Sequence, residues 1–369
     1  MADNTTKASG GEAAAPQAQP LKIYNMQSYL HDNMHKDVEE FIQSGRLKSG
    51  YNNLDAITNL YPGLYVVGAI SSLGKTTWVH QMADQMAEAG ERVVYFSMEQ
   101  NVLELASKSL ARIQAKKDMS TAMTSLQIRK NDADSRVTDA QEEYSKYAGN
   151  LVTVECSFRA TIEDIESMVT NCIKKQGIKP IVMVDYLQVI QPPKDFNSTT
   201  KDEVDLYLRR LKQLQSDYKL VMILISSLNR QNYLSQIDFE SFKESGGIEY
   251  TADVVWGLQL QAIHDKIFDE KAKLNEKREI IREAKKANPR KIELICLKNR
   301  FGISGYHCDF KYYPAYDYFE PDMDNLDMDA IEAAAEKDPD GFIDLPEGVE
   351  PPDFGAPEEK DPASKRKSF

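Results

Sequence analysis

A short segment near the start of the chain has the residue types and spacing that bind phosphate. It reads GAISSLGKTT, residues 68–77, and follows the apolar run Tyr65–Ile70, which predicts a buried strand. A helix is predicted directly after it, over Thr76–Ala89. In a strand–loop–helix unit, the loop N–H groups and the helix dipole favour an anion. Lys75 would reach the β- and γ-phosphates of a nucleoside triphosphate, and the Thr76 hydroxyl would hold Mg²⁺. This context favours a P-loop over a chance Gly-Lys-Thr.

The other residues of this loop complete the expected phosphate site. Ala69 stands where the eight-residue P-loop pattern has its first glycine. We expect Ala69, Ser72, Gly74 and Thr77 to contact the nucleotide together with the lysine and its neighbouring threonine.

Two carboxylates follow predicted strands. Glu99 comes directly after the apolar strand Arg92–Ser97, and Asp185 lies within IVMVDYLQVI, Ile181–Ile190. Ligands bind where the carboxyl ends of parallel strands meet, so both acids are expected beside the P-loop. Glu99 would orient or deprotonate the attacking water, although a solvent-facing glutamate has the same sequence context. Asp185 has the form of a Walker B acid, which holds the water shell of Mg²⁺.

Three later segments carry further candidate residues. The strand Leu220–Ser226 ends in SSLNR, where Ser227 would sense the γ-phosphate, unless this is an ordinary strand end. KESGGIEY predicts a glycine-containing loop. The hairpin Lys291–Leu297 and Ser304–Phe310 offers Lys298 and Arg300 at its turn. Paired cations there suit a finger that reaches an anion in the next subunit, whereas the alternative is a surface hairpin with two solvated bases.

Composition and charge limit the functional class. The chain has 369 residues with 41% hydrophobic content and no run of about 18 apolar residues, so no membrane span is expected. No secretory signal is recognised, and four scattered cysteines favour reduced thiols, which together predict a cytoplasmic protein. From Glu320 to Phe369 there are sixteen acidic and five basic residues, so the tail carries most of the net charge of −13. The body is nearly neutral. The acidity of the whole chain therefore does not exclude contact between the body and DNA.

The predicted organisation has four parts. Residues 1–21 form a disordered tail, residues 22–45 a linker or docking helix, residues 46–320 an α/β ATPase domain and residues 321–369 an acidic disordered tail. Within the second part, Met26–Ile42 has helical spacing, and its apolar stripe packs either on its own domain or on a neighbouring subunit. Within the last part, Met323–Ala335 is compatible with a helix. The aromatic run HCDFKYYPAYDYFE fits a strand packed on the sheet better than a platform for stacked bases.

Further elements are predicted along the domain. The expected strands are Leu151–Glu155 and Ala252–Gln261; helical segments are expected over Val102–Tyr147, Thr161–Gln176, Val204–Tyr218 and His264–Asn288.

Taken together, the motifs resemble a known family. GAISSLGKTT, YFSMEQ, VDYLQVI, ILISSLNR, KESGGIEYTADVV and LKNRFGISG occur in the order and spacing of DnaB-type replicative helicases, over about Leu47–Phe310. The resemblance implies a RecA-like P-loop fold: a mostly parallel twisted sheet flanked by helices, with a C-terminal β-hairpin. It implies ATP and Mg²⁺ as ligands, with Lys75, Glu99 and Asp185 catalytic.

The resemblance also implies partners. Lys298 and Arg300 would act on ATP bound by the neighbouring subunit of a homo-oligomeric ring, usually a hexamer. Single-stranded DNA would pass through the centre of the ring and contact two loops. The contacting residues would be Arg230, Lys243, Glu244, Gly246 and Gly247. Such backbone contacts tolerate any sequence and weaken with salt.

Three departures from the family qualify this expectation. Only about 45 residues precede the matching region, so the helical N-terminal domain of the family is expected to be absent. Ring assembly and primase contact would then depend on a separate primase or loader chain. Ser227 stands where the family usually has Gln, and the central loops contain few Lys or Arg. An ATP-driven DNA helicase or translocase is therefore predicted. The alternatives are a RecA-superfamily ATPase that uses ATP as an assembly switch and an accessory ring subunit, neither of which unwinds DNA.

Overall fold

The apolar runs of the sequence form one large sheet. The computed structural model describes residues 23–45, 47–192, 199–229, 234–242, 245–264 and 273–337. In these ranges nine strands pair in the order β3-β2-β4-β5-β1-β6-β7-β8-β9. The strands are β1 Gly63–Ala69, β2 Val93–Ser97, β3 Leu151–Glu155, β4 Ile181–Asp185, β5 Val221–Ser227, β6 Val254–Leu260, β7 Arg290–Asn299, β8 His307–Tyr313 and β9 Tyr318–Pro321. β1 to β6 are mutually parallel, whereas β7, β8 and β9 continue the sheet antiparallel.

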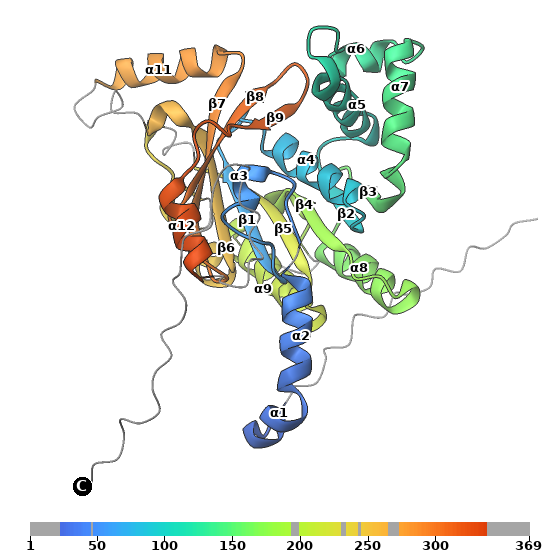
Figure 1. Cartoon of the computed structure of the whole chain (residues 1–369), viewed down its shortest axis with the longest axis vertical. Helices are drawn as coiled ribbons and strands as arrows, with labels where there is room; N and C mark the ends of the chain where they lie inside the picture. The colour runs from blue at the N-terminus through green and yellow to red at the C-terminus, as the bar shows by residue number, and fades with distance from the viewer. Residues whose placement is uncertain are drawn as a thin grey trace, which may run out of the picture.

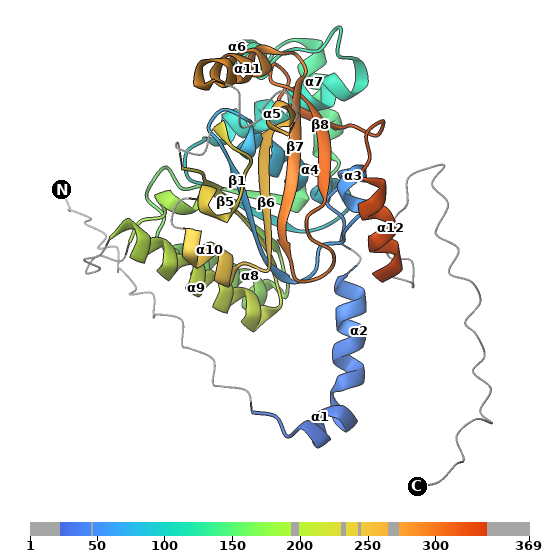
Figure 2. The same cartoon turned by 90° about the vertical axis from the view of Figure 1, so that its left-hand side faces the viewer.

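Helices cover both faces of the parallel part. The connections from β1 to β2 and from β2 to β3 run toward one edge of the sheet. The connections from β3 to β4, from β4 to β5 and from β5 to β6 run toward the other edge. Right-handed crossovers therefore place the helices of these two routes on opposite faces. α4 lies on one face and α8, α9 and α10 lie together on the other (Figure 2). The main helices are α4 Lys75–Glu88, α5 Val102–Asp118, α6 Ser125–Lys130, α7 Ser135–Ser145, α8 Ile162–Gln176, α9 Thr200–Tyr218, α10 Ser245–Thr251 and α11 Leu274–Lys286.

The core is continuous across the sheet and its first helix. Strands β1, β2, β4 and β6 are buried along their whole length, as strands covered on both faces should be. On the α4 face, Trp78 stacks on Tyr51 at 5.1 Å between ring centroids and meets Trp256 of β6 edge-on at 6.0 Å. These rings fix α4, and with it the P-loop that precedes it, against the sheet.

Helices α5, α6 and α7 form a separate lobe above α4 (Figure 1). Their small apolar cluster consists of Leu110, Ala111, Met123, Ile128, Val137 and Ala140. A capping box between Asn101 and Glu104 starts α5 directly after the end of β2. The helical content predicted for Val102–Tyr147 is therefore present as three helices.

The N-terminal helical segment projects from the body. It consists of α1 Met26–Asp32 and α2 Met34–Ser44, broken at Asn33, rather than the single helix predicted over Met26–Ile42. No residue of either helix is buried, and both extend away from the sheet (Figure 2). The apolar side chains of this segment thus stay largely exposed, including Met34, Val38 and Ile42.

The predicted strand that ends in Asp185 is present as β4, and Leu187–Val189 after it forms a 3₁₀ turn. Two other predicted elements differ from the structure. The charged helix predicted over His264–Asn288 is described only from Leu274. The predicted KESGGIEY loop becomes helix α10 from Ser245, because the segment packs on α9.

The ordered body also extends past residue 320. Helix α12, Met328–Lys337, lies in the range predicted as a disordered tail and buries Ile331 in the core. The packing of its apolar face explains why a net acidic segment is helical here. Among the described residues, no helix is both long and apolar enough to cross a membrane.

Candidate nucleotide site

The P-loop adopts a conformation that only part of its sequence signals. Ser72 and Gly74 both have left-handed backbones, with φ of 68° and 90°. A Cβ atom at Gly74 would lie 2.9 Å from Cζ of Tyr312 and 3.0 Å from the Phe319 ring. Glycine is therefore required at position 74 for two reasons, its backbone angle and the aromatic rings of β8 and β9 beneath it. The aromatic run predicted to pack as strands thus supports the loop.

Lys75 points across the carboxyl ends of the strands. Its Nζ lies 3.1 Å from the hydroxyl of Ser227, the last residue of β5. The same Nζ lies 5.2 Å from the centre of the Tyr186 ring. Ala69, which ends β1, pairs in register with Ser227 and is itself buried. The structure therefore brings the predicted lysine and serine together, and Ala69 contributes backbone at this point.

Thr76 and Asp185 meet at the end of β4. The buried Asp185 carboxylate accepts a hydrogen bond from the Tyr95 hydroxyl at 3.0 Å. Burial raises the pKa of Asp185, while the nearby Thr76 and Tyr95 hydroxyls and the Lys75 charge oppose the rise. A buried carboxylate of this kind is stabilised by a nearby cation.

Glu99 lies beside this pair. Ser97 and Asp185 are neighbours in register, and the Met98 N–H donates to the Asp185 carbonyl at 2.8 Å, which places the 98–100 turn next to the end of β4. Burial together with the nearby Glu99 charge raises the pKa of Tyr186 to about 12. The predicted base is thus exposed at the strand ends, close to a neutral phenol.

This donor set fits a magnesium nucleotide. Mg²⁺ in phosphate-transfer sites takes one or two protein oxygens and completes its shell with water and phosphate oxygens. Thr76 and Asp185 supply that number. Among the described residues, no cluster of three or more His, Cys, Asp or Glu side chains could hold a metal. Water and the phosphates of a bound nucleotide would complete the shell of an ion held by these two residues.

Sequence reasoning missed three contributors. The Gln188 side chain donates to the Ser226 hydroxyl at 2.8 Å and accepts from the Ser227 N–H at 3.2 Å. Arg290, at the start of β7, donates to the Ser72 carbonyl at 3.0 Å. Tyr186 lies beside Lys75, and the charge of Glu99 contributes to its raised pKa. Gln188 had a usable signal, a polar residue within the apolar run VDYLQVI. The contact of Arg290 depends on strands far apart in sequence and leaves no local pattern.

Thr77 does not lie among the strand ends. It is buried, and its hydroxyl donates to Asp317 at 3.1 Å and accepts from Lys108 at 3.2 Å. Asp317 also accepts from Ser125 of α6 at 2.7 Å, so these groups tie α4 to the helical lobe. The side chain of Thr77, predicted to bind nucleotide, has a structural partner instead.

The predicted finger residues lie at the opposite end of the sheet. Arg300 donates to Asp253 at 3.0 Å, and Asp253 in turn accepts from the N–H of Leu64 at the start of β1. Ala69 is five residues further along β1, roughly 17 Å away at the usual strand rise. Lys298 donates to the Glu249 carbonyl at 2.6 Å on the same side. Neither cation can therefore reach the P-loop of its own chain.

The predicted DNA-contacting residues are only partly described. Arg230, Lys243 and Glu244 lie outside the described residues. Gly246 and Gly247 lie in the first turn of α10 rather than in a loop. A Cβ atom at Gly247 would lie 2.0 Å from Oδ1 of Asp205, so glycine there permits close packing of α10 on α9.

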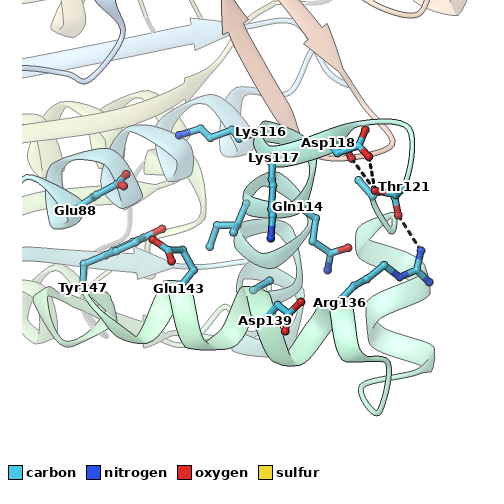
Figure 3. A pocket seen from close by; sticks show the side chains of 13 residues that line it. Glu88, Gln114, Lys116, Lys117, Asp118, Thr121, Arg136, Asp139, Glu143 and Tyr147 are labelled. Atoms are coloured by element: carbon cyan, nitrogen blue, oxygen red, sulfur yellow. Dashed lines mark hydrogen bonds between the residues drawn. The ribbon is translucent and has the colours of Figure 1, made fainter.

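A hollow elsewhere on the molecule contains none of the predicted site residues. It lies between α5 and α7, has a volume of about 590 Å³ and is drawn in Figure 3. Lysine and arginine side chains, among them Lys117 and Arg136, alternate there with acids such as Asp118 and Glu143. Because both signs of charge line it, it offers no concentrated field for an anion.

The fold and the site together define a class of protein. A mostly parallel sheet carries a P-loop after β1 and carboxylates after β2 and in β4, at the edge where such sheets bind ligands. This is a RecA-like P-loop nucleotide-binding domain. The model of the family described as "DnaB-like helicase C terminal domain" matches residues 46–321. The chain belongs to that family, which confirms the predicted resemblance.

Relatives in the family are replicative helicases. The Haemophilus influenzae protein named "Replicative DNA helicase DnaB" is 27% identical over 226 residues, covering 59% of this chain and 47% of the relative. The Leifsonia xyli protein of the same name is 29% identical over 226 residues, with coverage of 59% and 47%. The chain thus matches about half the length of these relatives.

Solved structures share the fold. One of them, described as an ATPase domain, superposes with a TM-score of 0.61 at 20% identity, covering 81% of this chain and 99% of that one. Another, described as a DnaB-like replicative helicase and its interactions with primase, gives a TM-score of 0.61 at 22% identity, covering 81% and 67%. These likenesses confirm the predicted RecA-like architecture, including the antiparallel strands at its C-terminal end.

Proposed function

We propose that this chain is the motor domain of an ATP-driven DNA helicase or translocase that works as a homo-oligomeric ring. The observation that carries the proposal is the division of the site between two ends of the sheet. Lys75, Glu99 and Asp185 lie at one end, whereas Arg300 lies at the other and is 51% exposed. A ring joins such ends, because each copy can present its finger to the P-loop of the next.

Each residue then has a chemical role in ATP hydrolysis. The P-loop N–H groups and Lys75 bind the phosphates, and Glu99 orients or deprotonates the attacking water. Thr76 and Asp185 would hold Mg²⁺, which neutralises charge on the phosphate oxygens when bound. Ser227, beside Lys75, is placed to respond to the γ-phosphate. Arg300 and Lys298 of a neighbouring copy would stabilise the charge that develops during phosphoryl transfer.

The exposed apolar residues of helix α2 favour the proposal of a ring. Met34, Val38 and Ile42 are 44%, 42% and 38% exposed and recur every four residues along α2. At 100° per residue they occupy an arc of about 80° on one side of the helix. We propose that this stripe docks on a second copy of the chain. A ring of six copies, a separate primase or loader chain and transient contact with single-stranded DNA complete the proposal.

Steady-state ATP turnover tests the proposal. The purified protein is assayed with and without single-stranded DNA, at low and moderate salt. Stimulation by DNA that declines with salt supports a DNA motor, because contacts to the phosphate backbone release counterions. Turnover that is the same with and without DNA at every salt concentration contradicts the proposal of a DNA motor and favours an ATP-dependent assembly switch.

A further inference from the structure

The loop that carries Arg300 rests on two groups. The Arg300 guanidinium pairs with the buried carboxylate of Asp253, and the Arg300 N–H donates to the Asp253 carbonyl at 3.0 Å. The next residue, Phe301, packs its ring on Tyr61, with 5.4 Å between the ring centroids. The direction of Arg300 is therefore set by an acid on one side and by an aromatic ring on the other.

Tyr61 also contacts helix α2. The ring of Phe41 stacks on Tyr61 at 4.8 Å, with an angle of 16° between the planes. Phe41, Tyr61 and Phe301 therefore form a continuous aromatic stack from α2 to the residue after Arg300. We call these three residues the aromatic stack.

The stack has close contacts with backbone along its length. A Cβ atom at Gly45, at the end of α2, would lie 2.3 Å from the Tyr61 ring, and one at Gly63 would lie 2.7 Å from the Phe301 ring. The Tyr61 N–H and carbonyl both bond the Tyr65 hydroxyl, at 2.8 and 3.0 Å. Tyr61 and Phe301 thus have little spare room, whereas Phe41 is 52% exposed and can move with α2, so a shift of the helix acts on the Tyr61 ring.

Outside the stack, α2 is held to the body by ion pairs at the surface. Lys219 of α9 pairs with Asp37 and Glu40 at 3.3 and 2.7 Å, and Lys179 pairs with Glu40 at 3.2 Å. All of these side chains are partly exposed, so the pairs contribute little and weaken with salt. A cavity of about 690 Å³ lies between α2 and the body, bounded in part by Phe41, Asp253 and Phe301. The helix thus has room to tilt.

We propose that the aromatic stack couples the position of α2 to the position of Arg300. When the apolar stripe of α2 docks on a neighbouring copy, the stack sets Phe301 and with it the direction of the finger. Phe41, Tyr61 and Phe301 are positioning residues, since none of them touches nucleotide. This inference rests on the proposed function, because Arg300 must act on ATP for its direction to matter.

The test compares substitutions at Phe41 with one on the apolar stripe of α2. Phe41→Leu keeps an apolar side chain but removes the stacked ring, whereas Phe41→Tyr keeps the ring. We expect Phe41→Leu to lower kcat about fivefold with unchanged KM for ATP and unchanged oligomer mass, a size typical of coupling between sites. Phe41→Tyr should retain the wild-type kcat. Val38→Asp, the matched control, should lower the oligomer mass instead.

A double variant separates coupling from a general structural defect. In an Arg300→Ala background, measured by single-turnover hydrolysis of labelled ATP, Phe41→Leu should cause no further loss. An equal loss in both backgrounds would overturn the coupling while leaving the proposed function intact. Normal turnover by Arg300→Ala alone would instead overturn the proposed function itself, and the inference with it.

Discussion

The two ends of strand β7 carry arginines with different surroundings. Arg290, at its start, donates to the Ser72 carbonyl in the P-loop of its own chain. Arg300, just beyond its end, pairs with Asp253 beside the start of β1. Because β7 runs antiparallel to β6, its first residue lies at the carboxyl ends of the parallel strands and its last at their amino ends. One strand thus supports the site in its own chain and, in the proposed ring, the site in the next.

The contact of Arg290 has a definite effect on the loop. In a planar trans peptide the C=O and the following N–H point in opposite directions. By holding the Ser72 carbonyl, Arg290 leaves the N–H of Leu73 directed away from its own guanidinium. Arg290 also lies over the Tyr312 ring, 5.8 Å from its centre, and Tyr312 in turn lies beneath Gly74. It therefore organises the P-loop in advance of phosphate binding.

Of the substitutions that test this comparison, that of Lys75 should have the largest effect on ATP binding and turnover. Lys75→Ala removes the cation that binds the phosphates, so ATP binding and turnover should both fall to background. Equilibrium binding of a fluorescent ATP analogue and steady-state ATPase measure the two losses. Retained turnover would show that the site lies elsewhere.

Arg300→Ala should have the next largest effect. A finger acting from the neighbouring copy contributes about 10³-fold or more to turnover, while ATP binds mainly to the P-loop side. We expect kcat to fall by that order with ATP affinity nearly unchanged, as measured by turnover and equilibrium binding. Wild-type turnover would mean that Arg300 is only a surface cation.

Arg290→Ala should act mainly on ATP binding. Loss of a hydrogen bond from a charged donor costs about 1.5–3 kcal/mol, which corresponds to roughly tenfold or more in affinity. We expect KM for ATP to rise about tenfold with kcat changed much less, and Arg290→Lys to restore part of the affinity. A fall in kcat at constant KM would contradict a role in organising the loop.

Thr77→Val should have the smallest effect on chemistry. The Thr77 hydroxyl bonds Asp317 and Lys108, away from the strand ends. Turnover should stay within about twofold of wild type, while the loss of a buried hydrogen bond, about 1 kcal/mol, lowers the melting temperature by roughly 2 °C. Thr76→Val serves as the matched control and should abolish turnover. Equal losses of turnover in both variants would indicate that the Thr77 side chain acts in the phosphate site.

Local patterns predicted the chemical centre of the site. Lys75, Glu99 and Asp185 each stand at the end of an apolar run, and parallel strands bring such ends together without any further information. The strands themselves were readable because burial on both faces produces continuous apolar runs. The family motifs also indicated Arg300 as a finger acting on a neighbouring copy, which stays a prediction.

Contacts between distant segments were not readable from the sequence. Nothing local to Arg290 indicates a partner 218 positions away, and nothing local to Thr77 indicates Asp317, 240 positions away. Gly246 and Gly247 read as loop residues, yet packing on α9 overrides their low helix propensity. The sequence of Met323–Ala335 was compatible with a helix, but the packing of α12 on the apolar surface that receives Ile331 was not predicted.

Mixing two inactive variants tests the divided site most directly. Lys75→Ala retains a finger without a working P-loop, and Arg300→Ala retains the P-loop without a finger. In mixed rings, some interfaces place the intact Arg300 of one variant beside the intact P-loop of the other. If subunits exchange at random and the sites act independently, roughly a quarter of the wild-type ATPase rate should return. Mass measurement of differently tagged chains verifies that mixed assemblies form. Activity that stays at the sum of the separate variants in verified mixed assemblies would contradict a site shared between neighbouring copies.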